Sequence, residues 1–141
     1  MATRIARNDL QLRRAYDPPS PRDGTRVLVD RIWPRGVRKA EARIDVWLKD
    51  VAPSTTLRQW FGHDPARWSE FRRRYRAELK HRSEALVRLR AMAKTACITL
   101  VYSARDERHN QAVVLKGLLA GRDPKRARRA APARLRAVPS A

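Results

Sequence analysis

The sequence predicts a single α/β domain in which a small, mainly parallel sheet of about three to four strands is flanked by helices. Two apolar runs rich in strand-forming residues, 26–32 and 96–102, supply the central strands. Between them, apolar residues recur at three- and four-residue spacing, which is typical of helices packed on a sheet. The length of 141 residues fits one domain.

The first two predicted strands flank a link rich in turn-forming residues. Residues 10–16 (LQLRRAY) alternate imperfectly and predict the first strand, and 26–32 predict the second, which cannot continue far past Pro34. Residues 17–24 (DPPSPRDG) contain three prolines and a glycine. The link is short, so the two strands form either a hairpin or a compressed crossover.

Helical spacing begins at Lys39 and predicts a helix ended by Pro53, with an apolar stripe of Ile44, Trp47, Leu48 and Val51. A short helix follows, because Ser54 is a suitable N-cap and Gly62 suits the C′ position. Its apolar residues are Leu57, Trp60 and Phe61.

Asp64 and Pro65 predict the start of a longer helix, because an acidic N-cap before a proline favours initiation. The apolar face of that helix consists of Trp68, Phe71, Tyr75 and Leu79. A further helix over about 83–94 precedes the strand 96–102 (ACITLVY), which we expect to be the most buried. The last helix is expected from about His109 to Ala120, with Gly121 as its stop.

The chain is strongly basic, with a formal net charge of +19 at pH 7. Apolar periodicity ends near Gly121, and seven basic residues and one acidic residue follow. We therefore expect residues 1–121 to form the domain and 122–141 to be a disordered basic tail. Such charge favours nonspecific nucleic-acid contact, for which the tail offers Arg126, Arg128 and Arg129. Only six of the 33 basic residues are lysines, so a GC-rich genome explains the remaining excess equally well.

The sequence also indicates the cellular compartment in which the protein is found. Cys97 is the single cysteine, so no internal disulfide forms and nothing indicates an oxidising environment. No stretch approaches the roughly 18 to 20 apolar residues of a membrane span, and the start MATRIARNDL has no signal-peptide core. We expect a cytoplasmic protein with no membrane partner. Neither a cofactor nor an oligomeric state is specified.

Polar and charged side chains follow both central strands, at the edge of the sheet where α/β proteins usually bind ligands. Guanidinium groups bind phosphate or carboxylate through two parallel hydrogen bonds, and the amides at the start of the helix at His109 attract anions. We expect an anion-binding site lined by Arg31, Trp33, Arg35, Ser103, Arg105 and Asn110. The alternative is that Asp30 and Asp106 pair with these arginines and only hold the loops in place.

The candidates for proton transfer are Asp30, His63, Asp106 and His109. Alternatively, His63 satisfies a backbone carbonyl and has no chemical role. No spacing of histidines, cysteines and carboxylates supports a metal site, so none is predicted. Cys97 opens a buried strand and is expected to be an inert core thiol.

Ordered motifs extend from Tyr16 to about Leu119: Tyr16-Asp17-Pro18, Asp23-Gly24, Arg26 to Gly36, Asp45 with Trp47, Lys49 to Ser54, Leu57-Arg58 with Trp60-Phe61, His63-Asp64-Pro65, Trp68, Phe71, Tyr75, and Tyr102 to Leu115. In this combination the chain resembles the YeaO-like branch of the domain of unknown function 488 family. The resemblance implies a cytoplasmic α/β domain whose biochemical role is not established. Broader members carry a cysteine- and histidine-rich segment after the last core strand. The corresponding residues 102–110 (YSARDERHN) contain no cysteine, so thiol chemistry is not implied.

Two functions follow from these observations. In the first, the domain binds a phosphate-bearing or other anionic small molecule at the strand ends. Arg31, Arg35 and Arg105 orient the anion, and enzymatic turnover is left open. In the second, a noncatalytic protein associates with nucleic acid through its arginine-rich surface and tail. Arginines clustered around one pocket favour the first function, and a continuous basic surface favours the second.

Overall fold

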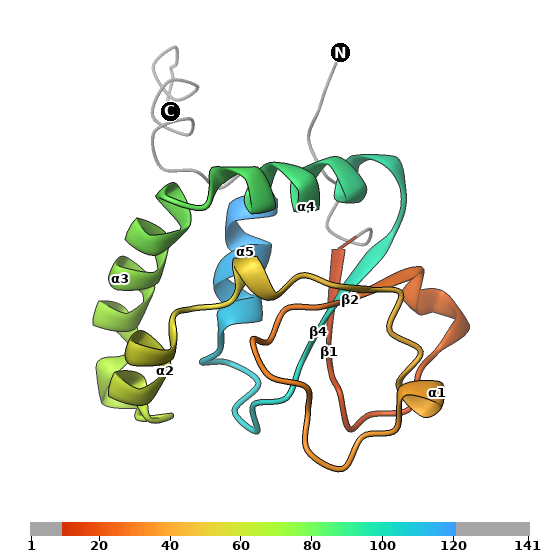
Figure 1. Cartoon of the computed structure of the whole chain (residues 1–141), viewed down its shortest axis with the longest axis horizontal. Helices are drawn as coiled ribbons and strands as arrows, with labels where there is room; N and C mark the ends of the chain where they lie inside the picture. Colours follow the sequence, from red (N-terminus) through yellow and green to blue (C-terminus); the bar gives the residue numbers. More distant parts are fainter. Residues whose placement is uncertain (1–9, 121–141) are drawn as a thin grey trace, which may run out of the picture.

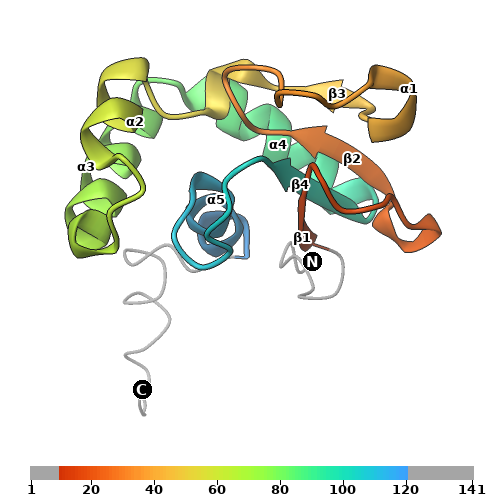
Figure 2. The same ribbon diagram turned by 90° about the horizontal axis from the view of Figure 1, so that it is seen from below.

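The computed structural model describes residues 10–120 of the chain. Within this range, four strands form a parallel sheet in the order β1-β4-β2-β3, namely β1 (Leu10–Arg14), β2 (Thr25–Leu28), β3 (Val46–Trp47) and β4 (Ile98–Tyr102). Five α-helices accompany it, namely α1 (Lys39–Ala42), α2 (Thr55–Phe61), α3 (Trp68–Lys80), α4 (Ser83–Thr95) and α5 (Gln111–Leu119). This confirms the predicted α/β class with a small parallel sheet. Helices α2 and α3 lie on the opposite side of the molecule from α1 (Figures 1 and 2).

The link between the first two strands is a compressed crossover. Both β1 and β2 run parallel to β4, which lies between them. Residues 15–24 must therefore pass over one face of β4, and a 3₁₀ turn, Pro21–Asp23, lies on this path. The hydroxyl of Thr99 in β4 donates a hydrogen bond to the Asp23 carbonyl at 2.7 Å, which fixes the link to the sheet.

The helix predicted from Lys39 to Pro53 is wrong beyond its first turn. Helix α1 ends at Ala42, and Arg43 adopts a left-handed conformation with a φ of 50°. The Asp45 amide then donates to the Arg26 carbonyl at 2.9 Å, and β3 continues the pairing along β2. Pairing with an open sheet edge overrides the helical spacing of the apolar residues. A 3₁₀ turn, Lys49–Val51, follows β3.

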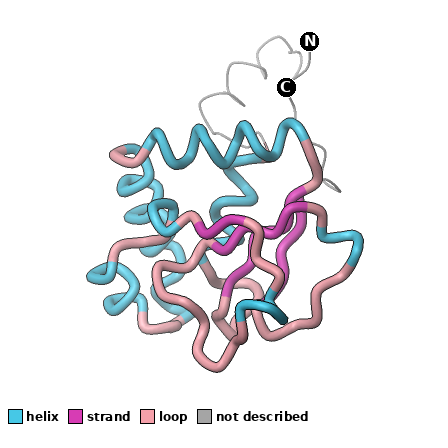
Figure 3. Tube along the Cα trace, turned by 45° about the vertical axis from the view of Figure 1, so that its right-hand side comes forward, coloured by secondary structure: helices cyan, strands magenta, loops and turns pink. Residues whose placement is uncertain are grey.

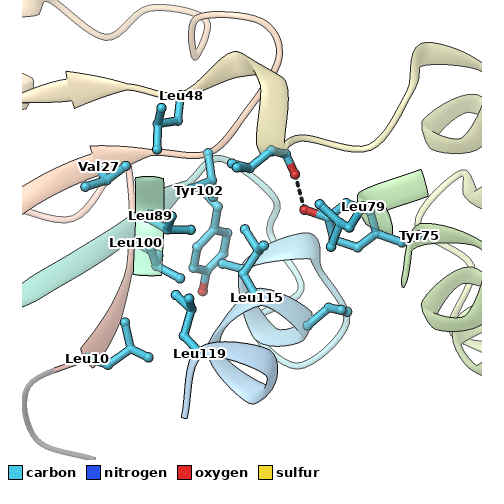
Figure 4. Packing of buried hydrophobic residues seen from close by; sticks show 14 of the residues in the cluster. Leu10, Val27, Leu48, Tyr75, Leu79, Leu89, Leu100, Tyr102, Leu115 and Leu119 are labelled. Atoms are coloured by element: carbon cyan, nitrogen blue, oxygen red, sulfur yellow. Dashed lines mark hydrogen bonds between the residues drawn. The ribbon is translucent and has the colours of Figure 1, made fainter. Parts of the chain in front are cut away.

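The two faces of the sheet are covered differently. Alternate strand residues such as Val27 and Leu100 pack with residues of α4 and α5, including Leu89 and Leu115, in the main core (Figure 4). The intervening residues Leu28 and Val101 lie on the other face, beneath partly buried Trp33, Val37, Ile44 and Trp47. Helices α4 and α5 therefore pack on one face, and the segment between β2 and β3, together with the Trp47 side chain, covers the other.

The predicted helix caps are confirmed. The Ser54 Oγ accepts a hydrogen bond from the Leu57 amide at 3.1 Å, and Gly62 ends α2 with a φ of 54°. Asp64 caps a 3₁₀ turn, Pro65–Arg67, that leads directly into α3. Buried Tyr75 of α3 donates its hydroxyl hydrogen bond to the Val51 carbonyl (Figure 4).

The last strand and helix also follow the prediction. All five residues of β4 are buried. Helix α5 begins at Gln111 with Asn110 as its N-cap, whose side chain accepts a hydrogen bond from the Val113 amide at 3.1 Å. Gly121 and the predicted basic tail, with Arg126, Arg128 and Arg129, lie outside the described residues. None of the helices in residues 10–120 is long and apolar enough to cross a membrane.

Candidate functional site at the carboxyl edge of the sheet

Loops gather beyond the carboxyl ends of the strands (Figure 3). The last sheet contact of the β2 segment is the hydrogen bond from the Val29 amide to the Val101 carbonyl at 3.0 Å. Beyond this hydrogen bond, the segments that follow β2 and β4 diverge around a pocket of about 120 Å³. We call this the edge pocket; it is lined by Asp30, Arg31, Ile32, Ala52, Pro53, Arg58, Phe61, His63, Phe71, Ser103, Ala104, His109, Asn110 and Gln111.

Asp30 is the buried acid of the edge pocket, with only 7% of its surface exposed. One carboxylate oxygen accepts a hydrogen bond from the Ser103 amide at 3.0 Å, and the other accepts one from the Gln111 side chain. Burial raises the pKa of Asp30, and the hydrogen bonds from Ser103 and Gln111 and the charge of Arg58 offset only part of this rise. Asp30 therefore ties both central strand ends to the start of α5.

Two side chains from the α2 region bring positive charge or hydrogen-bond donors to the edge pocket. Arg58 lies on α2 one turn before Phe61, and its guanidinium forms no hydrogen bond to another described residue. His63 follows α2 in a left-handed conformation with a φ of 59° and also forms no side-chain hydrogen bond within the described residues. Both groups remain available to a ligand.

Arg31 also lines the edge pocket, and two of its five N–H donors are used within the fold. Its Nε donates to the Pro53 carbonyl at 3.2 Å, and one terminal nitrogen donates to the Ala52 carbonyl at 3.1 Å. These bonds attach the end of β2 to the segment before α2. Arg31 therefore contributes a nearby positive charge and holds one wall in place.

His109 forms the opposite wall with the start of α5. Its Nδ1 lies 2.8 Å from a carboxylate oxygen of Asp106, and its ring meets Trp68 edge-on with 5.1 Å between ring centroids. The hydrogen bond to His109 and the amides of Arg108 and His109 lower the pKa of Asp106. This arrangement fixes the orientation of the imidazole and leaves its Nε2 without a partner in the described residues.

Several residues predicted at this site do not line the edge pocket. Trp33 donates its Nε1 hydrogen bond to the Val37 carbonyl at 2.8 Å and packs on Trp47, so it belongs to the opposite face of the sheet. Arg35 and Arg105 are exposed and are not among the lining residues. Of the three arginines expected around one anion, only Arg31 lines the edge pocket. The segment after Pro34 turns away from the pocket to cover the other face.

The alternative, in which Asp30 and Asp106 pair with these arginines, also differs from the structure. Among the described residues, Asp30 is bound by a backbone amide and an amide side chain, and Asp106 is bound by His109 and two backbone amides. Of the predicted residues, Asp30, Arg31, His63, Ser103, His109 and Asn110 line the same pocket.

Sequence reasoning missed Arg58 and Gln111. Arg58 was recognisable as the polar residue one turn before Phe61 on a short capped helix, and it lies within one of the shared motifs. Gln111 directly follows the N-cap of α5, a position from which a side chain can reach the strand ends. Neither signal says that α2 lies beside the pocket at the strand ends, which depends on the packing of α2 against α3.

The lining of the edge pocket contains no cysteine. Cys97 precedes β4, at the opposite end of the strand from the edge pocket, and its sulfur lies 3.3 Å from the Gln11 side-chain nitrogen. Within residues 10–120, no group of three or more histidine, cysteine or carboxylate side chains is arranged to hold a metal ion.

The fold and the edge pocket define a class: a small α/β domain with a polar pocket where the central parallel strands end. The chain matches, over residues 9–134, the model of the family described as "Inactive DUF488-N3 subclade", and it belongs to this family. This confirms the resemblance drawn from the ordered motifs.

Two relatives are similar over most of the chain. Uncharacterized protein Rv3073c of Mycobacterium tuberculosis (strain H37Rv) is 47% identical over 113 residues, which cover 80% of this chain and 95% of the relative. Uncharacterized protein YeaO of Escherichia coli (strain K12) is 42% identical over 107 residues, which cover 76% of this chain and 93% of the relative. No solved structure matches the chain significantly.

Proposed function

We propose that this protein binds a small oxyanion, such as phosphate or a phosphate-bearing or carboxylate-bearing metabolite, in the edge pocket without transforming it. The observation that carries the proposal is that the side chains of Arg58 and His63 line a concave site and form no hydrogen bond within the described residues. A guanidinium group is an effective fork for phosphate or carboxylate oxygens. Arg31 adds a second positive charge on the adjoining wall.

The size of the edge pocket restricts the ligand. A volume of about 120 Å³ is below the roughly 300 to 1,000 Å³ of sites that enclose drug-sized ligands. The anionic group itself would occupy this space, and any larger part of the molecule would extend past exposed Ile32 into solvent. The proposal therefore concerns a single phosphate or carboxylate group and not an enclosed nucleotide.

The description of the family supports binding without turnover. The family is described as inactive, and cysteine is absent from residues 102–110. Asp30 is held by Ser103 and Gln111, and His109 is held by Asp106. These bonds favour rigid positioning. We also propose that the protein acts in the cytoplasm, because a single cysteine gives no sign of an oxidising compartment.

Calorimetry with inorganic phosphate tests the proposal on the full chain. The Arg58→Gln variant should bind phosphate at least about tenfold more weakly than the wild type, since one charged hydrogen-bond donor is worth on the order of 1.5 to 3 kcal/mol. Arg88→Gln is the matched control, because Arg88 is exposed on α4 and does not line the edge pocket. Absence of phosphate binding, or equal weakening by both substitutions, would overturn the proposal.

The second candidate function is nonspecific association with nucleic acid through the basic surface and residues 122–141. The observation that favours it is the net charge of +19. On α3, however, Arg73 and Arg74 both pair with Glu70, so part of the arginine-rich surface is neutralised. Removal of residues 122–141 should flatten the salt dependence of DNA binding, and an unchanged slope would exclude the tail.

A further inference from the structure

We infer that Asp30 makes the edge pocket selective for oxyanions that carry an O–H group, such as hydrogen phosphate, over oxyanions without one, such as sulfate. The inference rests on the proposed function, because it assigns the chemical class of the anion that binds there. It follows from the position of a buried carboxylate among the donors of the same small pocket.

Asp30 has hydrogen-bonding capacity that the fold does not use. One carboxylate oxygen accepts a hydrogen bond from the Ser103 amide, the other accepts one from the Gln111 side chain, and the Ser103 side chain also stabilises the carboxylate. A carboxylate has about four lone-pair sites, so at least one remains for a further donor. Asp30 also lines the edge pocket, where a ligand atom is the available source of that donor.

The remaining lining residues supply the protein groups that face a bound anion. Arg31 and Arg58 supply positive charge, and His63 and His109 are the titratable groups that share the pocket with Asp30. The Asp106 carboxylate is engaged with His109 outside the lining set. Asp30 is the only carboxylate among the lining residues, and the charge of Arg58 acts on it. An anion that binds to Arg58 in this small pocket therefore lies close to Asp30.

The nature of the anion decides whether this approach is favourable. A fully deprotonated oxyanion brings only acceptor oxygens to Asp30, so two acceptors face one another in a partly desolvated site. Hydrogen phosphate brings an O–H donor and replaces the repulsion by a hydrogen bond to an ionised acceptor. Burial raises the pKa of Asp30, and a more basic carboxylate is a stronger acceptor.

A competing role for Asp30 is purely structural, because its hydrogen bonds connect β2, the end of β4 and α5. That role alone predicts that Asp30→Asn alters stability and leaves the preference between anions unchanged. Selectivity between two anions of similar shape therefore separates the two roles.

The test is calorimetry on the full chain at pH 7 and constant ionic strength, with inorganic phosphate and sulfate as probes. The wild type should bind phosphate at least about tenfold more tightly than sulfate. Asp30→Asn should reduce this ratio to about threefold or less, because an amide can donate to sulfate. Equal affinities in the wild type, or an unchanged ratio in Asp30→Asn, would overturn the inference and leave the proposed function intact. If neither anion binds, both the inference and the proposed function fail.

A second probe tests the inference on the wild type alone, should Asp30→Asn fail to fold. Monofluorophosphate has the charge of the hydrogen phosphate dianion and nearly its shape, with fluorine in place of the hydroxyl group. The wild type should bind it at least about tenfold more weakly than phosphate, since a site built for a hydroxyl donor rejects the analogue that lacks it. Equal binding of the two dianions would contradict the role of Asp30.

Discussion

Two buried carboxylates, Asp23 and Asp30, lie just before and just after strand β2, and they differ in their bonding partners. Asp23 is 1% exposed and forms ion pairs with Arg26 at 2.6 Å and with Arg13 at 3.1 Å. Asp30 has no ion pair among the described residues and is held by two neutral donors. Only Asp30 borders the edge pocket.

The pKa values of the two groups reflect this difference. Burial acts to raise the pKa of Asp23, but hydrogen bonds from Ser20 and Arg26 and the charges of Arg13 and Arg26 together lower it. Burial raises the pKa of Asp30, and its weaker partners do not compensate. Asp23 is therefore a structural carboxylate, whereas Asp30 retains acceptor capacity beside unpartnered donors.

The largest expected effect is the loss of stability in Asp23→Asn. The substitution leaves the Arg26 guanidinium buried without its counter-charge, which costs about 3 to 5 kcal/mol for a broken buried pair. Urea unfolding followed by circular dichroism measures this loss. A change below about 1 kcal/mol would show that the two carboxylates are energetically alike.

The pH dependence of stability should have opposite sign for the two groups. Asp23 has a lowered pKa, so its contribution is present above its unfolded value of 3.8 and is lost as the pH falls through the folded value. Asp30 has a raised pKa, so the wild type loses stability as the pH rises from 3.8 through the folded value. The penalty of Asp23→Asn should shrink on acidification from pH 7, and that of Asp30→Asn should grow. Parallel trends in urea titrations would refute the assignment.

Asp30→Asn should destabilise the fold by about 1 kcal/mol at pH 7. The amide retains one acceptor oxygen, so one of the two hydrogen bonds, from Ser103 or Gln111, is lost. Urea unfolding under the conditions used for Asp23→Asn gives the comparison. A loss as large as that of Asp23→Asn would make Asp30 primarily a structural residue.

The smallest expected effect on stability is that of Arg58→Gln. Arg58 is exposed and its side chain forms no hydrogen bond within residues 10–120, so the free energy of unfolding should change by no more than about 0.5 kcal/mol. Thermal unfolding without added anion checks this value. A larger loss would mean that Arg58 supports the fold and that weaker phosphate binding by the variant has a structural origin.

Local patterns predicted much of this fold. The strand 96–102, the Ser54 and Asp64 caps and the apolar face of α3 all follow from short-range spacing and capping chemistry. Local patterns did not predict the structure of the segment after Arg43, because β3 forms only through pairing with β2. Helical spacing does not encode this contact.

The candidate site was predicted in part for the same reason. Asp30 and Ser103 follow the strand ends closely, Asn110 caps α5, and the parallel sheet brings both strand ends to the same edge. Arg35 and Arg105 were misplaced because nothing in the sequence shows where the loops turn after leaving the sheet. Arg58 reaches the edge pocket from α2, whose position depends on the packing of α2 against α3 and of α3 against the core.

A crystal structure of the full chain grown in phosphate tests the central claim most directly. The account predicts an ordered phosphate in the edge pocket, bound by Arg58 and His63 and with one oxygen within hydrogen-bond distance of Asp30. An edge pocket that contains only water, at a phosphate concentration that saturates binding in calorimetry, would contradict it.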